Sequence, residues 1–118
     1  MIWRVRDRGT FEALRRSGRR ARRGPVTVTY LPAGAGSTAT RVAFGVSRKV
    51  GNAVTRNRTR RRLRSVMQGL DVSPDGLRPG TYLLTTRPEV VDVDYRRLAE
   101  LVAAACSESS QASGKPVR

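Results

Sequence analysis

The sequence predicts an α+β fold in which a strongly basic helix connects two β-strands. Residues 26–31 and 41–47 alternate between apolar and small or polar side chains, as strands with one buried face do. A third strand is predicted at residues 81–86. Residues 59–70, which precede it, have apolar side chains at helical spacing and belong to the basic helix. The length of 118 residues fits one domain, which we place at residues 1–106.

The N-terminal part is predicted to be an extended arm followed by a short helix. The arm comprises residues 1–9, and Thr10 is a suitable N-cap for a helix over residues 11–17, which Gly18 is expected to end. A dense basic run without an acid overlaps the end of this helix. Its mutual repulsion favours contact with phosphate groups over a merely solvated face. The run consists of Arg15, Arg16, Arg19, Arg20, Arg22 and Arg23.

The two alternating strands are most simply paired as an antiparallel hairpin around a glycine-rich loop at residues 32–37. Tyr30 shares the face of the first strand that also carries valines. In the second strand Phe44 belongs to the apolar face and is expected to contribute to the core.

Residues 48–66 are the most basic stretch of the chain, with eight basic residues and no acid. They are predicted to form a helix that starts at Gly51-Asn52. A narrow stripe suited to packing on the sheet consists of Thr59, Leu63, Val66, Met67 and Leu70. A second face consists of Asn57, Arg61 and Arg64, with Arg56 and Arg60 beside it and Arg58 and Arg62 nearer the stripe. We expect this second face to meet a polyanion.

The C-terminal part is predicted to contain a loop at residues 69–80, the third strand and a final helix. Asp92 or Asp94 is expected to cap that helix. Its buried side is predicted to consist of Tyr95, Leu98, Leu101, Val102 and Ala105. Residues 107–118 are polar and are predicted to form a disordered tail.

The charge of the chain is large, positive and unevenly distributed. Lys plus Arg is 24 and Asp plus Glu is 9, which gives a net charge of +15. Residues 1–65 carry 18 basic side chains against two acids, whereas residues 66–118 carry six against seven. Lys49 and Lys115 are the only lysines, and the other basic residues are arginines. A GC-rich genome would produce this preference for arginine. Arginine also suits bidentate contact with phosphate. The first half is therefore expected to face a polyanion, and the second half to be scaffold.

Catalytic chemistry by the chain alone is not indicated. There is no His, and Cys106 is the only Cys, which excludes Ser-His and Cys-His arrangements and a Cys/His metal cluster. Cys106 lies in an apolar run and is expected to be buried. The sequence has no secretory signal and no long apolar span, so we expect a cytoplasmic protein without membrane association.

One ordered motif stands out within the basic stretch. It reads Lys49-Val50-Gly51-Asn52-Ala53-Val54, then Arg56-Asn57-Arg58, then Arg61-Arg62-Leu63-Arg64. This order and spacing resemble the signature of the bacterial ribonuclease P protein family, and they are far more specific than a generic basic patch. Phe11 before Gly18, and a strand that leads directly into the motif, agree with that family. The resemblance covers roughly residues 5–106.

The resemblance implies an α-β-β-β-α-β-α sandwich that is similar to a ribosomal-protein domain. The motif helix would lie in a left-handed crossover between parallel strands. A further strand would fall near residues 19–23, where the pattern of the sequence does not itself predict one.

The resemblance also implies an RNA-binding subunit that assists a catalytic RNA in removing the 5′ leader from precursor tRNA. The partners would be the ribonuclease P RNA and precursor tRNA, with no protein partner required. Mg²⁺ ions held mainly by the RNA would carry out hydrolysis, so neither catalytic residues nor a metal site is expected in this chain. The main alternative is a ribosomal or general structured-RNA-binding protein without a processing role. A metal-dependent nuclease acting alone and a DNA-binding helix module are two further hypotheses.

Two sets of site residues follow from the resemblance. The RNA-binding set comprises Lys49, Asn52, Arg56, Asn57, Arg58, Arg60, Arg61 and Arg64. A cleft for the single-stranded leader, between the first helix and the sheet, would be lined by Phe11, Arg15, Tyr30, Phe44 and Arg48. The family often has an aromatic residue where Arg15 stands, so this cleft is expected to be more electrostatic than usual. Phe11 suits the core and a stacking platform equally, and counting from Gly18 places the family's strand aromatic nearer Thr29 than Tyr30.

Overall fold

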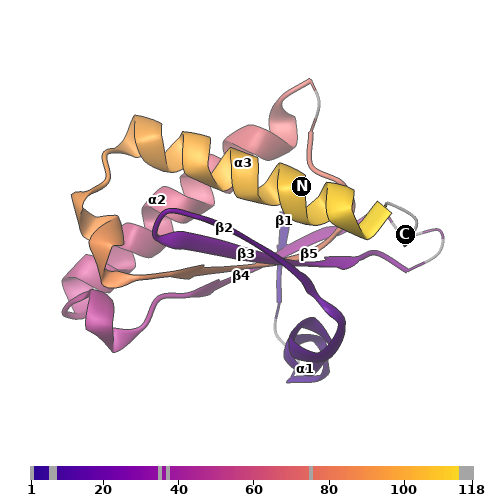
Figure 1. Cartoon of the computed structure of the whole chain (residues 1–118), viewed down its shortest axis with the longest axis horizontal. Coiled ribbons are helices and arrows are strands. Elements are labelled where there is room, and N and C mark those ends of the chain that lie inside the picture. The colour runs from indigo at the N-terminus through magenta and orange to yellow at the C-terminus, as the bar shows by residue number, and fades with distance from the viewer. Residues whose placement is uncertain (1, 6–7, 35, 37, 75, 115–118) are drawn as a thin grey trace.

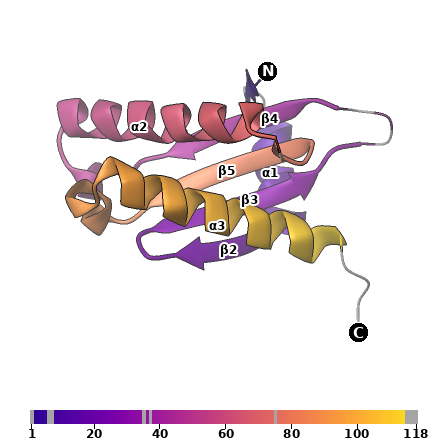
Figure 2. The ribbon, with the colours of Figure 1, turned by 90° about the horizontal axis from the view of Figure 1, so that it is seen from above.

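The computed structural model describes residues 2–5, 8–34, 36, 38–74 and 76–114. In chain order the elements are β1 (Ile2–Arg4), α1 (Arg8–Ser17), β2 (Arg19–Arg23), β3 (Val26–Pro32), β4 (Thr40–Gly45), the 3₁₀ helix η1 (Arg48–Val50), α2 (Ala53–Val72), β5 (Gly80–Thr86), the 3₁₀ helix η2 (Pro88–Asp92) and α3 (Tyr95–Gly114). The strands form one sheet in the order β1-β4-β5-β3-β2. Helices α2 and α3 cover one face of this sheet, and α1 crosses the other (Figures 1 and 2).

Strand β5 lies inside the sheet, and its position contradicts the predicted hairpin. It pairs antiparallel with β3 and parallel with β4, so it separates the two strands that the hairpin would make neighbours. Tyr82 and Leu84 of β5 are fully buried, which suits a central position. The hairpin prediction is wrong because alternation indicates which side of a strand faces the core but not which strand lies beside it.

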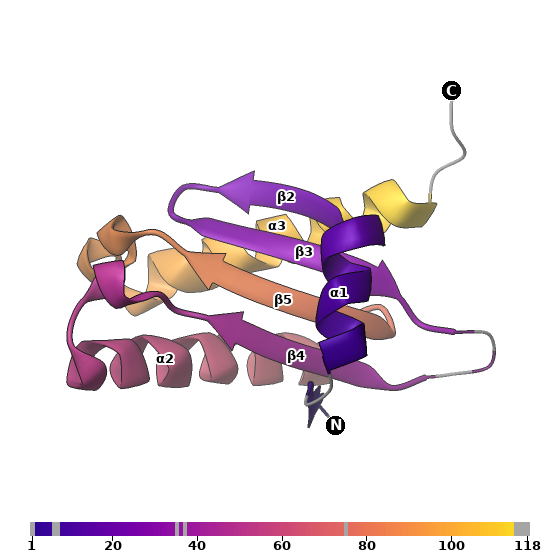
Figure 3. The same ribbon diagram turned by 90° about the horizontal axis from the view of Figure 1, so that it is seen from below.

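The parallel strands β4 and β5 are joined by α2 through a left-handed crossover (Figure 3). Such connections are right-handed in about 98% of cases, so this hand is distinctive. From α1 onward the element order is α-β-β-β-α-β-α, which confirms the fold class implied by the resemblance. The strand expected near residues 19–23 is β2, paired antiparallel with β3. Strand β1, paired parallel with β4, is an additional strand within the predicted arm.

The main core lies between the sheet and helices α2 and α3. The stripe predicted for the basic helix is confirmed, with Leu70 half-buried and four residues buried: Thr59, Leu63, Val66 and Met67. Near the centre the rings of Tyr30 and Tyr82 lie 4.9 Å apart. Their hydroxyls donate to the backbone carbonyl oxygens of Pro79 and Arg78, at 2.6 and 2.8 Å. None of the helices in the described ranges is both long and apolar enough to cross a membrane.

Helices α1 and α3 differ from the predicted helices at their first residues. α1 begins at Arg8, so Thr10 lies inside the helix and the predicted N-cap is wrong. The predicted cap of α3 is confirmed, because Oδ1 of Asp94 accepts a hydrogen bond from the Arg97 backbone N–H at 2.8 Å. Tyr95 is 46% exposed and does not belong to the buried side, unlike the other residues predicted there: Leu98, Leu101, Val102 and Ala105.

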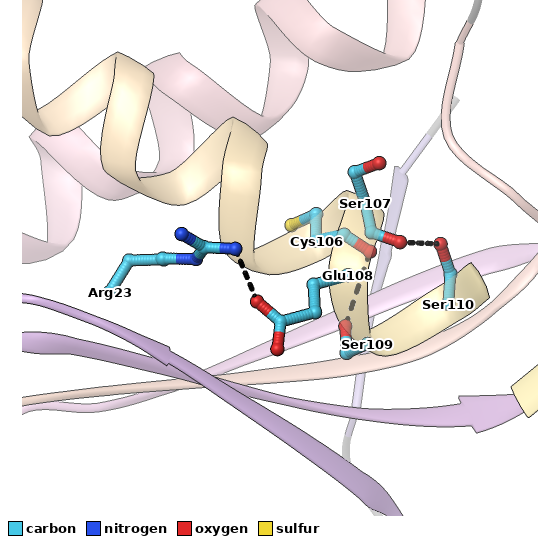
Figure 4. Close-up of polar contacts among 6 residues, drawn as sticks. All are labelled: Arg23, Cys106, Ser107, Glu108, Ser109 and Ser110. Atoms are coloured by element: carbon cyan, nitrogen blue, oxygen red, sulfur yellow. Dashed lines mark hydrogen bonds and ion pairs between the residues drawn. The ribbon is translucent and has the colours of Figure 1, made fainter. Parts of the chain in front are cut away.

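Helix α3 continues through much of the segment predicted to be disordered. It extends to Gly114, and both Ser109 and Ser110 are buried. Each of these two hydroxyls donates to the backbone carbonyl oxygen three residues earlier (Figure 4). Polar composition is therefore a poor indicator here, because serine side chains can be satisfied within the helix itself. Residues 115–118 of the predicted tail lie outside the described residues.

Contacts of Glu108 and Cys106 help to connect this last part of α3 to the remainder of the domain. Glu108 forms an ion pair with Arg23 of β2 at 2.5 Å (Figure 4). Cys106 is buried, as predicted, with its sulfur 3.7 Å from that of Met67. Burial raises the pKa of the Cys106 thiol to about 12, so the thiol is a packing group rather than a nucleophile.

The junction between α1 and β2 is packed so closely that it requires glycine. The Gly18 backbone N–H donates to the Leu14 carbonyl oxygen at 2.9 Å, and α1 ends there as predicted. A Cβ atom at Gly18 would collide with that oxygen and with Cγ2 of Thr29 on β3. The absence of a side chain therefore allows the end of α1 to approach the sheet.

The substitution Gly18→Ala is expected to lower the free energy of unfolding by about 1–3 kcal/mol, because the added methyl group forces α1 away from β3. Gly69→Ala is the control. Gly69 lies in α2 with open space around its Cβ position, so alanine there is expected to raise the free energy of unfolding by about 0.5–1 kcal/mol. Urea unfolding followed by circular dichroism measures both, and a neutral Gly18→Ala would contradict the packing explanation.

Candidate nucleic-acid interface

The basic helix α2 begins at a defined cap. Oδ1 of Asn52 accepts a hydrogen bond from the Thr55 backbone N–H at 2.9 Å. Asn52 remains exposed, so its contact with RNA stays a prediction beside this structural role. Arg48 and Lys49 lie in the preceding helix η1, and both are exposed. The beginning of the motif thus presents two cations just before the first turn of α2.

One side of α2 is attached to the connection that leads into α3. The guanidinium of Arg62 donates to the Val93 carbonyl oxygen at 2.5 Å, and the hydroxyls of Ser65 and Tyr95 lie 2.8 Å apart. Arg62 is half-buried, whereas Arg58, one turn earlier, is exposed. Arg62 therefore contributes to packing, and Arg58 remains accessible to a ligand.

The solvent-facing surface of α2 carries the remaining residues of the predicted RNA-binding set. Asn57, Arg61 and Arg64 are exposed, as predicted for one face of the helix. Nη1 of Arg60 donates to Oδ1 of Asn57 at 2.9 Å, which orients the Arg60 guanidinium along the helix. Arg56 is half-buried beside them. Oriented guanidinium groups are well suited to the oxygens of a phosphate.

A cavity of about 420 Å³ lies at the free edge of β4, between α1 and α2. Strand β1 pairs with β4 as far as Val42, whose carbonyl oxygen also accepts a hydrogen bond from the Val5 backbone N–H at 3.2 Å. Among the strands that the structure describes, none pairs with the residues that follow on this edge. The lining includes Phe11, Phe44, Arg60 and Arg64. Phe11 is 36% exposed, and the Arg64 guanidinium lies 6.0 Å from the centroid of the Phe44 ring, at the outer limit of a cation–π contact. Phe44 thus packs against the core, as predicted, and also lines a cavity.

A second, more open depression adjoins this cavity. The two share Arg4, Phe44, Arg60 and Arg64. The second adds Asn57 and Arg61, and no acidic residue of the described chain lines either one. Aromatic rings next to uncompensated cations are the usual binding surface for single-stranded nucleic acid. Sequence reasoning missed Arg4, because its positive charge was the only signal and nothing indicated where the arm would lie.

The remaining residues of the predicted leader cleft lie in different places. Arg15 is exposed on α1. Tyr30 is only 3% exposed and packs on Tyr82 in the core beneath α2 and α3. The prediction that Tyr30 lines the cleft is therefore wrong. The neighbouring Thr29 lies on the opposite face, against Gly18 at the end of α1, because a shift of one residue along a strand inverts the face.

A mixed sandwich with an arginine-covered helix in a left-handed crossover, and an aromatic cavity beside that helix, defines a nucleic-acid-binding protein. The ribonuclease P family model matches residues 2–109. The chain is 39% identical over 111 residues to the ribonuclease P protein component of Streptomyces avermitilis, which covers 86% of this chain and 87% of that one. It is 32% identical over 114 residues to the ribonuclease P protein component of Erythrobacter litoralis, covering 97% and 91%. This chain therefore belongs to the ribonuclease P protein family, whose members are components of an endoribonuclease that also contains RNA.

Two solved structures have the same fold. The ribonuclease P protein of Staphylococcus aureus aligns with a TM-score of 0.77 at 17% identity, over 89% of this chain and 93% of that one. The ribonuclease P protein from Thermotoga maritima aligns with a TM-score of 0.71 at 20% identity, over 86% and 92%. Together with the family match, they confirm the family and the fold that the motif led us to expect.

Arg62→Ala is expected to lower the free energy of unfolding by about 1–2 kcal/mol, because the Val93 carbonyl oxygen loses a charged donor. Arg61→Ala removes the same charge from the preceding residue of the helix, where the side chain is exposed, and is expected to change stability by less than about 0.5 kcal/mol. Thermal unfolding of the two variants measures the difference. Equal losses would show that Arg62 has no special role in attaching α2.

Proposed function

We propose that this chain assists the ribonuclease P RNA in removing the 5′ leader from precursor tRNA. The proposal rests on the motif of α2, whose Arg60 and Arg64 line the same cavity as Phe11 of α1. A single surface is thereby formed by α2, which is expected to contact the catalytic RNA, and by α1, which is expected to contact the leader. The family match over residues 2–109 supports the same role.

The polar and basic residues of the motif would bind the catalytic RNA. The set consists of Arg56, Asn57, Arg58, Arg60, Arg61 and Arg64, with Lys49 and Asn52 where the helix begins. A guanidinium donates two parallel hydrogen bonds to a phosphate, and many such contacts together provide affinity that depends on salt. The Asn57 amide oxygen already accepts from Arg60, so its NH₂ group is the part that would donate to RNA.

The leader would enter at the free edge of β4. Phe11 and Phe44 offer ring surfaces for unstacked bases, and such stacking contributes about 1–3 kcal/mol per base. Arg15 on α1 and Arg48 just beyond β4 are exposed and would contact leader phosphates. Tyr30 takes no part, because it is buried on the other face of the sheet.

Hydrolysis would depend on Mg²⁺ ions that the RNA holds, with no autonomous active site in this chain. Within the described residues, no three His, Cys, Asp or Glu side chains gather where they could share a metal ion. The two cavities are lined without a carboxylate, whereas Mg²⁺ is usually bound through carboxylate groups and phosphates. The contribution of the protein would be to position the RNA, without a further protein partner. A cytoplasmic location stays a prediction.

Reconstitution with a bacterial ribonuclease P RNA tests the proposed function. At a Mg²⁺ concentration too low for the RNA alone, the chain is expected to restore removal of the leader, because its arginines neutralise phosphates that free cations otherwise screen. Gel analysis of labelled precursor tRNA measures the released leader. Unchanged cleavage would favour a ribosomal or general structured-RNA-binding protein. Cleavage by the protein without RNA would instead reveal a nuclease that acts alone.

The double substitution Arg61→Ala/Arg64→Ala is expected to flatten the salt dependence of binding to the catalytic RNA. Each lost phosphate contact reduces the slope of log K against log salt by about 0.7–0.9. Arg96→Ala/Arg97→Ala removes the same charge from exposed positions of α3 and is expected to leave the slope unchanged. Filter binding at several KCl concentrations measures the slopes. If both double variants give the wild-type slope, the outer face of α2 does not contact the RNA.

A further inference from the structure

The sheet face opposite α2 and α3 is only partly covered. Helix α1 crosses one end of this face (Figure 3), where Thr29 and Thr81 are buried. Toward the other end Gly45 is exposed, and Thr27 and Thr85 are half-buried. Their small side chains leave a shallow surface on which an extended chain can lie.

Strand β2 borders this surface and consists almost entirely of arginine. Ala21 is buried in the core, on the side of α3. Because successive side chains of a strand alternate, Arg20 and Arg22 lie on the opposite, open face. Arg23 is on the same side as Ala21, where it pairs with Glu108 of α3 (Figure 4). The strand therefore has two arginines on the open face of the sheet.

These two arginines are exposed and uncompensated. In the part of the chain that the structure describes, neither Arg20 nor Arg22 pairs with an acid, and the Glu12 carboxylate of α1 lies 3.9 Å from Arg16. Nε of Arg22 donates to the Gly24 carbonyl oxygen at 3.2 Å, which leaves its two terminal nitrogens free to donate. Two like charges side by side on an open surface favour an anionic ligand.

The pairing of the strands places Arg22 at the end of a straight row across the open face. Gly45 is the partner of Thr85, Thr85 of Thr27, and Thr27 of Arg22. The row leads from β4 over three strand spacings, about 14 Å, to β2. A parallel row beside it ends at Arg20, but it runs over Thr29, which is buried at the end of α1, and over half-buried Leu83. The uncovered path over the sheet is therefore the row that ends at Arg22, with Arg20 beside it. The cavity with the two phenylalanines lies at the β4 end, so a single strand leaving that cavity over the sheet reaches the arginines.

We propose that Arg20 and Arg22 bind backbone phosphates of the distal leader, the nucleotides farthest from the cleavage site. The contact extends the leader-binding surface from the β4 edge to the opposite edge of the sheet, and it rests on the proposed function above. The row that ends at Arg22 has positive charge at its β2 end and only small side chains between β4 and β2. Binding along it therefore depends on the length of a leader rather than on its base sequence.

Binding of precursor tRNA to the reconstituted RNA–protein complex tests this inference with two leaders, of about ten and about two nucleotides. Arg20→Ala/Arg22→Ala is expected to weaken binding of the long-leader substrate about tenfold near 0.15 M salt, as the loss of two single-strand phosphate contacts predicts. The short-leader substrate is expected to bind with its wild-type affinity. Arg96→Ala/Arg97→Ala removes the same charge from exposed positions of α3, and it is expected to affect neither substrate.

Circular dichroism of all variants establishes that they are folded. A long-leader affinity that Arg20→Ala/Arg22→Ala leaves unchanged would overturn the inference. Equal weakening with both leaders would also overturn it, because the arginines would then contact the catalytic RNA or the tRNA body. Equal weakening by the two double variants would mean that only the overall charge matters. The proposed function is tested separately, by measuring whether the wild-type chain stimulates cleavage of the short-leader substrate. If it does not, both proposals fail.

Discussion

Helix α2 is held on the sheet by a narrow row of buried side chains, and the position of every cation on it depends on that attachment. Eight basic residues within 48–66 repel one another, and the helix is stabilised mainly by burial of its few apolar groups, each worth about 1.5–3 kcal/mol when large. The contacts of Arg62 and Ser65 with the chain entering α3 fix how the helix is rotated about its axis. That rotation turns Arg60 and Arg64 toward the free edge of β4.

The sequence predicts faces well and neighbours poorly, for a physical reason. Alternation records which side of a strand is buried, and it placed Val26, Val28 and Tyr30 together on one face. The resemblance suggested Tyr30 for the cleft, but the position of Tyr30 on the same face as two buried valines correctly indicated the core.

Strand β2 could not be predicted from alternation, because Ala21 is its only apolar residue and the other four residues are arginines. Its existence followed from the resemblance alone.

The cavity at the β4 edge combines residues that no local pattern connects. The motif identified the helix that carries Arg64, and through it the family, from consecutive residues. Phe11 and Phe44 come from two other elements, and they line one cavity with Arg64 at the edge of β4, beyond the residues that pair with β1. The order of strands in the sheet and the end of a three-residue strand depend on long-range packing, which short-range spacing does not record.

Strand β2 is also one of the two edge strands of the described sheet. An edge strand has unpaired backbone N–H and C=O groups, which form a template for pairing with a second chain. Four of the five residues of β2 are arginine, so two such edges brought together would set like charges opposite one another. The charge that attracts RNA therefore also opposes strand-to-strand aggregation between copies of the protein for as long as no RNA is bound.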